Sequence, residues 1–177
     1  ATGILSMAFF NWCYFTAIQE ISISIGVVLL YTAPAFVIIL SRIFSGERIT
    51  KRKIAALILT ITGCSFIAGI VPGADISVSF RGLLIGLGSG LGYALYPVLA
   101  KPAGKIYSPA TITAYTFFFT AVVLIPFSGI HNSIGLLASP RVILYSAGLG
   151  LFPTVLAYIL YTKGLSHVEA GNAAIVS

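Results

Sequence analysis

Long apolar segments alternate with short polar ones along most of the chain. A helix that crosses a bilayer needs about 20 predominantly apolar residues. Five segments meet this requirement: residues 21–44, 54–71, 82–100, 109–127 and 142–162. Residues 2–17 have the character of a sixth helix without its beginning, and residues 171–177 that of a seventh at its start. The pattern predicts an all-α membrane protein, a polytopic helical bundle, and we expect the chain to be a fragment of a longer protein.

The polar segments carry residues that end and begin helices. Gly46 suits the left-handed conformation that closes a helix, and Thr50 can cap the next one. Ser108 and Ser139 each stand directly before a proline, which favours a helix start. Connections this short predict that successive helices are antiparallel neighbours, with no room for a soluble domain.

Basic residues gather in alternate gaps between the apolar segments. Eight of the ten Lys and Arg residues do so: Arg42, Arg48, Lys51, Arg52, Lys53, Lys101, Lys105 and Lys163. The gaps between them hold only Arg81 and Arg141. Because the cytoplasmic loops of multi-pass proteins collect Lys and Arg, we predict that segment 42–53 is cytoplasmic and segment 75–81 external.

The composition excludes a soluble domain. Hydrophobic residues make up 58% of the chain and charged residues 8%, whereas soluble domains carry about 25% charged residues. The net charge of +6 is divided among several loops and forms no single basic face. We therefore expect a lipid bilayer as the environment and no nucleic-acid partner.

The end of the chain repeats its beginning when shifted by 147 residues. The aligned pairs are Gly3 with Gly150, Tyr14 with Tyr161, Ala17 with Gly164, Ile18 with Leu165 and Ile21 with Val168. The shift spans five predicted helices, an odd number, so the two copies would face opposite ways across the membrane. Inverted repeats are found in many alternating-access transporters.

Several short motifs also follow one another in a fixed order. They are residues 14–18 (YFTAI), residues 21–25 (ISISI), Pro34, residues 46–49 (GERI) and Gly63. In these motifs the chain resembles the EamA-type permeases of the drug/metabolite transporter superfamily, whose members have ten helices in two inverted five-helix repeats. The resemblance implies that residues 1–71 hold helices three to five, the end of the first repeat. Residues 80–177 would then hold helices six to nine of a truncated second repeat. Glu20 departs from the family, in which many members carry a basic or aromatic residue there.

Every Asp, Glu, Lys and Arg lies in or beside a loop. Charged residues within a membrane usually mark proton relays or ion sites, and hydrolysis needs an acid/base pair or a metal. Cys13 and Cys64 lack metal-ligand spacing. We therefore expect no enzyme, no catalytic residue, no metal and no cofactor, and no carboxylate coupled to protons in this part of the protein.

Uncharged polar residues inside the spans are the remaining candidates for solute binding. We predict that six of them bind the solute: Asn11, Tyr14, Tyr31, Thr32, Tyr93 and Tyr158. Asn11 and Tyr14 share one helix face with Met7, and the shift of 147 places Tyr158 opposite Asn11. The alternative is that these side chains join helices by hydrogen bonds or belong to an interfacial aromatic belt.

Prolines and glycines suggest where the helices bend and pack. Pro34 lies in the middle of segment 21–44, where a proline removes a backbone hydrogen bond and kinks the helix. We predict that Pro34, and Pro153 as its looser equivalent, form part of a gate, although membrane helices also tolerate proline without such a role. Gly82, Gly86 and Gly90 recur every four residues and predict close helix packing.

The leading functional prediction is a secondary transporter in the cytoplasmic membrane of a prokaryote. It would move small organic metabolites, such as amino acids or drug-like solutes, by alternating access. The alternative is a non-transporting membrane scaffold or partner subunit, which would have no central polar cavity and a dimer face built on the glycines. Neither the coupling ion nor the oligomeric state follows from these residues.

Overall fold

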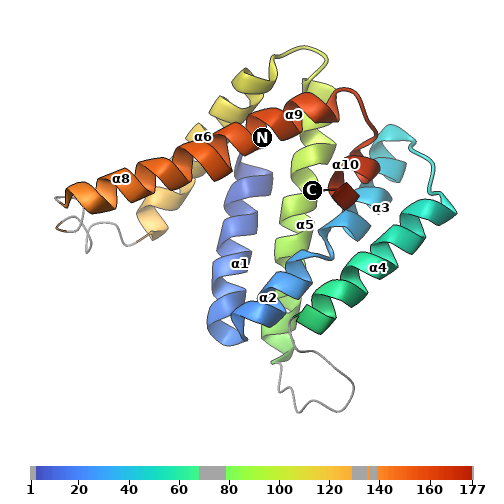
Figure 1. Cartoon of the computed structure of the whole chain (residues 1–177), viewed down its shortest axis with the longest axis horizontal. Helices are drawn as coiled ribbons and strands as arrows, with labels where there is room; N and C mark the ends of the chain where they lie inside the picture. Colours follow the sequence, from blue (N-terminus) through green and yellow to red (C-terminus); the bar gives the residue numbers. More distant parts are fainter. Residues whose placement is uncertain (1–2, 68–78, 129–134, 136–138, 177) are drawn as a thin grey trace.

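The computed structural model describes residues 3–67, 79–128, 135 and 139–176, and this part of the chain folds into helices joined by short turns (Figure 1). The elements in chain order are η1 (Gly3–Ala8), α1 (Phe9–Glu20), α2 (Ile23–Leu30), α3 (Ala33–Ser45), α4 (Lys51–Ile67), α5 (Phe80–Ala103), α6 (Pro109–Leu124), η2 (Ile125–Phe127), α8 (Pro140–Leu149), η4 (Gly150–Leu156), α9 (Ala157–Leu165) and α10 (Ala170–Val176). Elements η1 and η4 are π-helical, and η2 is a short 3-10 helix.

Four helices in the described residues are long and apolar enough to cross a membrane: Ile23–Ser45, Phe80–Ala103, Pro109–Phe127 and Pro140–Leu165. They correspond to four of the five predicted spans, which confirms the predicted all-α membrane bundle. The fifth predicted span, 54–71, coincides with α4 as far as Ile67, and its last residues lie outside the described part. The predicted helix at 2–17 is formed by η1 and α1, which continue to Glu20.

Helix α5 runs through the middle of the bundle, with α1 on one side and α2 and α3 on another (Figure 1). The three glycines that predict close packing face α2 and the start of α3. A Cβ atom at Gly82, Gly86 or Gly90 would meet Ile21, Leu29 or Thr32, respectively. The face toward α1 is equally close, since a Cβ at Gly92 would lie 2.9 Å from the Cα of Phe10.

The apolar span Ile23–Ser45 is interrupted between α2 and α3. Helix α2 ends at Leu30, and Pro34 lies in the first turn of α3, so Tyr31 and Thr32 form a turn between the two halves of this span. The amide of Thr32 donates to the carbonyl of Leu29 at 3.1 Å, and the Thr32 hydroxyl donates to the same carbonyl at 2.6 Å. The carbonyl of Leu30 loses its helical partner because residue 34 has no N–H.

Helix ends follow the turn residues of the sequence. Helix α3 is closed by Gly46 at φ 66°, as predicted. The Thr50 hydroxyl accepts the amide of Lys53 at 3.3 Å, and the Ser108 hydroxyl accepts that of Thr111 at 3.2 Å. Ser139 precedes the first residue of α8 but makes no side-chain cap.

The internal repeat reappears in the secondary structure. Gly3 and Gly150 each begin a π-helical segment, while Ile23 and Ala170 each begin the second α-helix that follows it. Both pairs are separated by the shift of 147 residues that aligns the sequences. Because π-helix accounts for well under 1% of protein residues, its occurrence at both equivalent positions supports a common structural unit.

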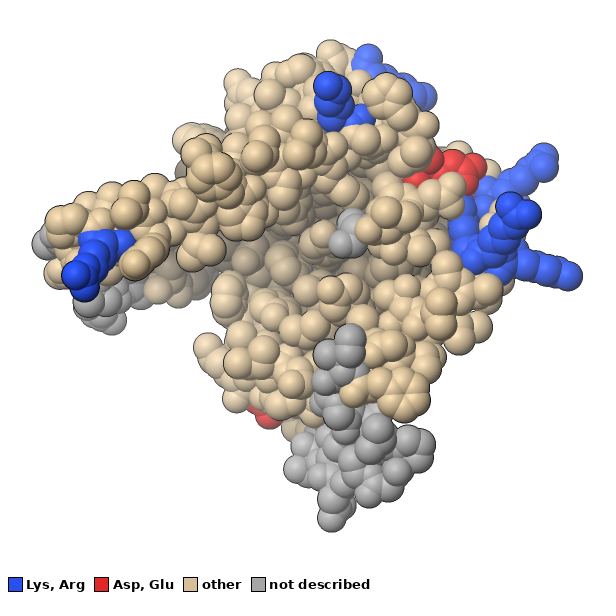
Figure 2. Space-filling view, in the orientation of Figure 1, with Lys and Arg blue, Asp and Glu red and all other residues tan. Residues whose placement is uncertain are grey.

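Charged residues are sorted between the two ends of the bundle. At one end, Lys101 lies 2.9 Å from Glu47 and Lys53 lies 2.6 Å from Glu169. Figure 2 shows most of the visible Lys and Arg side chains on the upper and right-hand parts of the surface and a further basic side chain at the left-hand end. At the opposite end, Arg81 pairs with Glu20 at 3.2 Å. The predicted sidedness of these ends stays a prediction.

Candidate functional site

A small hollow lies where the break between α2 and α3 faces α5 and α10. It has a volume of about 130 Å³ and is lined by Leu30, Tyr31, Ala33, Pro34, Tyr93 and Ala174. This volume corresponds to roughly four water molecules at about 30 Å³ each. Three predicted site residues, Tyr31, Pro34 and Tyr93, therefore line the same hollow.

Tyr93 connects this hollow to a group of stacked aromatic rings. Its ring meets that of Phe10 edge-on at 5.5 Å, and Phe10 stacks on Tyr14 at 5.7 Å. Tyr158 on α9 lies near Tyr93. Two predicted residues on different helices, Tyr14 and Tyr158, are thus linked to the hollow through Tyr93.

Tyr158 is the second centre of this aromatic group. Its ring packs edge-on against Tyr96 at 5.0 Å and Phe117 at 5.1 Å, and its hydroxyl lies 3.5 Å from the sulfur of Met7. The hydroxyl of Tyr161 is buried and has no hydrogen-bond partner within the described residues. Edge-to-face aromatic pairs contribute beyond their buried area, so the group forms a rigid wall. We call it the aromatic cluster, made of Phe10, Tyr14, Tyr93, Tyr96, Phe117, Tyr158 and Tyr161.

Two other predicted binding residues use their hydrogen-bond donors within their own helix. The amide of Asn11 donates to the carbonyl of Met7 at 2.7 Å, and Thr32 bonds to Leu29 as described above. Asn11 is still close to the aromatic cluster, because Met7 contacts Tyr158. Its amide, however, already satisfies a backbone carbonyl.

Pro153 is not part of the hollow. It is exposed within η4, and the Thr154 hydroxyl donates to the Leu149 carbonyl at 2.9 Å. That carbonyl is the one a normal residue 153 would bond in an α-helix, so the threonine replaces the proline's missing N–H. The π-helical segment has a local cause, and the structure does not place Pro153 beside Pro34.

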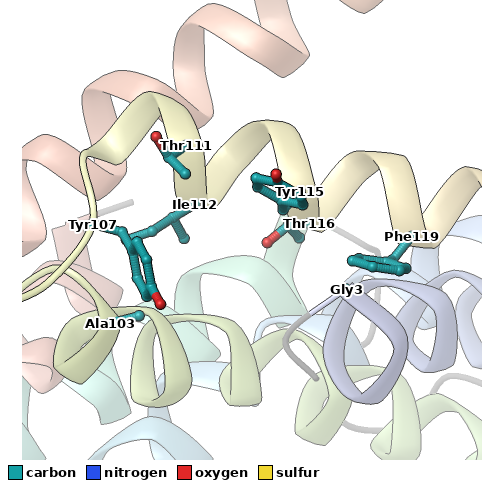
Figure 3. A pocket seen from close by; sticks show the side chains of 8 residues that line it. All are labelled: Gly3, Ala103, Tyr107, Thr111, Ile112, Tyr115, Thr116 and Phe119. Carbon is teal, nitrogen blue, oxygen red and sulfur yellow. The ribbon is translucent and has the colours of Figure 1, made fainter.

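A larger hollow of about 400 Å³ lies between α6, the end of α5 and the start of η1 (Figure 3). None of the predicted site residues lines it. Tyr107 and Tyr115 project from its α6 side and are 56% and 62% exposed, so it opens on the outer surface of the bundle. The hollow at Tyr31 and Tyr93 is lined by residues of α2, α3, α5 and α10 and of the turn between α2 and α3, and three predicted site residues line it, so it is the better candidate.

The sequence analysis missed an ionic cluster at the basic end of the bundle. The Glu47 carboxylate is 7% exposed and accepts hydrogen bonds from Lys101 at 2.9 Å and from the amides of Ala170 and Gly171 at 2.8 and 3.2 Å. Lys53 lies 3.6 Å from the same carboxylate. The signal in the sequence was a single Glu among five basic residues of segment 42–53.

The environment of Glu47 favours its charged form. Burial alone would raise the pKa of this carboxyl, but hydrogen bonds from Lys101 and from the two amides outweigh burial and lower the pKa below its ordinary value of 4.5. Charged and hydrogen-bonded partners stabilise the carboxylate more than the neutral acid. Glu47 is therefore ionised at neutral pH.

Comparisons with known proteins identify the family. The sequence model of the EamA-like transporter family matches residues 1–69 and 80–177. An "uncharacterized transporter" of Archaeoglobus fulgidus is 32% identical over 98% of the chain and 62% of its own length. The "uncharacterized transporter" YwfM of Bacillus subtilis is 28% identical over 97% of the chain and 57% of its length.

A third relative has a named activity. The threonine/homoserine exporter RhtA of Salmonella typhimurium is 27% identical over 72% of the chain and 40% of its length. The chain spans about three fifths of the length of the first two relatives. No solved structure matches it. Because the family match covers nearly every residue and the helices are those of a multi-pass membrane protein, the chain belongs to the EamA-like transporter family.

Proposed function

We propose that the full-length protein is a secondary transporter that moves small organic solutes across the cell membrane of a prokaryote by alternating access. The observation that carries this proposal is the uncharged hollow at the break between α2 and α3. Tyr31 and Pro34 come from the part of the chain assigned to the first repeat, whereas Tyr93 and Ala174 come from the second. Transporters built from inverted repeats bind their solutes at the repeat interface, where helices are interrupted.

The chemistry of the hollow suits an amino acid or a small amphiphilic solute. Aromatic faces attract cations, so the rings of Tyr31 and Tyr93 suit an ammonium group. The hydroxyl of Tyr31 can donate to a carboxylate or a carbonyl. The name of the Salmonella relative, a threonine/homoserine exporter, makes these two amino acids the first solutes to test.

The alternative of a non-transporting scaffold relied on a free glycine face. Positions 82, 86 and 90 instead pack against Ile21, Leu29 and Thr32 of the same chain. These glycines are therefore not available as the core of a dimer contact, which favours the transporter.

The test is solute exchange by the purified full-length protein in liposomes. Loss of one hydrogen bond to the solute costs about 1 kcal/mol, so Tyr31→Phe should raise the KM for the transported amino acid roughly fivefold. Tyr158→Phe tests whether the aromatic cluster also contributes to solute binding. Asn11→Ala tests the predicted binding face of α1. The matched control is Tyr145→Phe, because Tyr145 is 68% exposed on α8 and should transport like the parent.

Two results would contradict the proposal in different ways. A parent that exchanges none of a panel of amino acids and drug-like amphiphiles, although it is folded, is not the proposed transporter. If the parent transports solute and all three site variants have the same rate and KM as the parent, the binding site lies elsewhere.

A further inference from the structure

One carboxylate joins three segments that are far apart in the chain. Glu47 lies in the loop between α3 and α4, Lys101 near the end of α5, and the Ala170 and Gly171 amides at the start of α10. Lys101 also donates to the Val168 carbonyl at 3.0 Å, in the turn before α10. These bonds hold together the loop between α3 and α4, the end of α5 and the turn between α9 and α10.

Lys53 extends this arrangement to a second carboxylate. Its ammonium donates to Glu169 at 2.6 Å and to the Arg48 carbonyl at 3.3 Å, and it lies 3.6 Å from Glu47. The side chain of Lys53 is 5% exposed. Its charge is therefore compensated by protein groups more than by water.

The ion pairs cross the boundary between the two proposed repeats. Glu47 and Lys53 belong to residues 1–71, whereas Lys101 and Glu169 belong to residues 80–177. Among the described residues, the opposite end of the bundle has the pair Arg81–Glu20 across the same boundary, but there the Arg81 side chain is 78% exposed. An exposed pair contributes little, whereas removing one partner of a buried pair leaves an uncompensated charge and is strongly destabilising.

We propose that Glu47, Lys53, Lys101 and Glu169 form an ionic clamp that closes the basic end of the transporter and opens when the solute passes that side. The inference rests on the proposed alternating-access function, because rocking of one repeat against the other must separate these ion pairs. The structure holds the clamp closed.

The geometry of the clamp also allows it to open. Its central groups, Glu47 and Lys53, are 7% and 5% exposed, but Lys101 and Glu169 are 26% and 46% exposed. Water can therefore reach the outer partners first and hydrate each charge as it leaves the clamp. A clamp at the membrane surface can exchange protein partners for water, which a charge deep in the bilayer cannot do.

Thiol accessibility of the hollow tests the clamp without any solute. The reporter is Ala174→Cys, since Ala174 lines the hollow and is 6% exposed; Cys13 and Cys64 are replaced by Ala. A charged, membrane-impermeant maleimide is added to inside-out membrane vesicles that contain the full-length protein. Glu47→Gln should accelerate labelling about tenfold or more, because loss of one partner of a buried ion pair shifts a closed–open equilibrium by at least one factor of ten.

Lys101→Gln is the second variant, since it removes one ion pair and leaves Glu47 bonded to the α10 amides. It should accelerate labelling by a smaller factor, and it carries the test if Glu47→Gln does not fold in a thermal-stability assay. The matched control is Glu20→Gln, which removes the exposed pair at the other end and should leave the labelling rate unchanged.

Folded variants that label at the parental rate would overturn the clamp. So would equal acceleration by Glu20→Gln, since that indicates general loosening of the bundle. Solute exchange is measured separately. Accelerated labelling in a protein that exchanges no solute supports the closing contact and contradicts the proposed transport, whereas normal transport with unchanged labelling contradicts the clamp alone.

Discussion

A methyl group at position 92 should disturb the aromatic cluster from outside it. Gly92 on α5 faces the backbone of α1, where a Cβ would lie 2.9 Å from both the Cα and the N of Phe10. Phe10 in turn carries the ring contacts to Tyr14 and Tyr93. Because the clashing atoms belong to a helix backbone, no side-chain rotation can relieve the contact.

The size of the effect follows from the required movement. Ordinary Cβ contacts begin at 3.4 Å, so α1 and α5 must separate locally by about 0.5 Å in Gly92→Ala. Overpacking of this kind costs about 1–3 kcal/mol, while replacing a helical glycine with alanine returns up to about 1 kcal/mol. We expect a net loss of stability of about 1 kcal/mol or more.

Substitutions at two other helical glycines, Gly88 and Gly148, should cost less stability and serve as controls. A Cβ at Gly88 would lie 3.2 Å from the sulfur of Cys13, the end of a side chain, so Gly88→Ala should cost less. A Cβ at Gly148 on α8 meets no atom within 4 Å, so Gly148→Ala should be neutral or slightly stabilising. The assay is thermal unfolding of the full-length protein in detergent, followed by a thiol-reactive dye that reports exposure of Cys13, which is 2% exposed when folded.

The same series shows whether backbone contact is the cause. Gly92→Ala should lower the melting temperature most, by about 2 °C or more, and should also raise the KM for solute. A melting temperature for Gly92→Ala equal to that of Gly148→Ala would refute the reasoning, because it would mean that α1 and α5 are not held in backbone contact.

Three further predictions concern topology and the loop after α3. Cysteines at Ser45 and at Ser77, which lies outside the described residues, should differ in labelling by an impermeant reagent added to intact cells: only Ser77→Cys should react, and the reverse result contradicts the topology. The pKa of the Glu47 carboxyl is lowered on folding, so its contribution to stability is complete above pH 4.5 and is lost as the pH falls through the lower, folded value. The melting temperature of the parent should therefore fall between pH 7 and pH 3, and that of Glu47→Gln should fall less. Gly46→Ala should cost about 1 kcal/mol, because Gly46 has a φ of 66° and alanine is strained there, whereas Gly63→Ala, in a helix with free space around its Cβ, should cost nothing in the same melting assay.

Features that depend on neighbouring residues could be predicted from the sequence. Span positions followed from apolar length, the end of α3 from Gly46, and the start of α6 from Ser108, since each rests on backbone conformation within a few residues. The sorting of basic residues to one end followed from the order of the gaps. The family resemblance was carried by motifs of the same local kind.

The site depended on contacts that no local pattern encodes. In a soluble helix the buried face is marked by apolar residues, but these spans are apolar on every side, so the sequence did not show that Asn11 bonds to its own helix. Nor did it show how closely Leu29 and Thr32, on either side of the turn between α2 and α3, meet Gly86 and Gly90 of α5.

Charge pairing gives the clearest contrast between sequence and structure. The sequence alone determined that Glu47 lies in a basic loop at a helix end. Only the tertiary structure decided that this carboxylate is buried and bonded to Lys101 and to the start of α10, 54 and 123 residues further along the chain. The physical reason is that ion pairing depends on distances of a few ångströms, and those distances are set when separate helices pack.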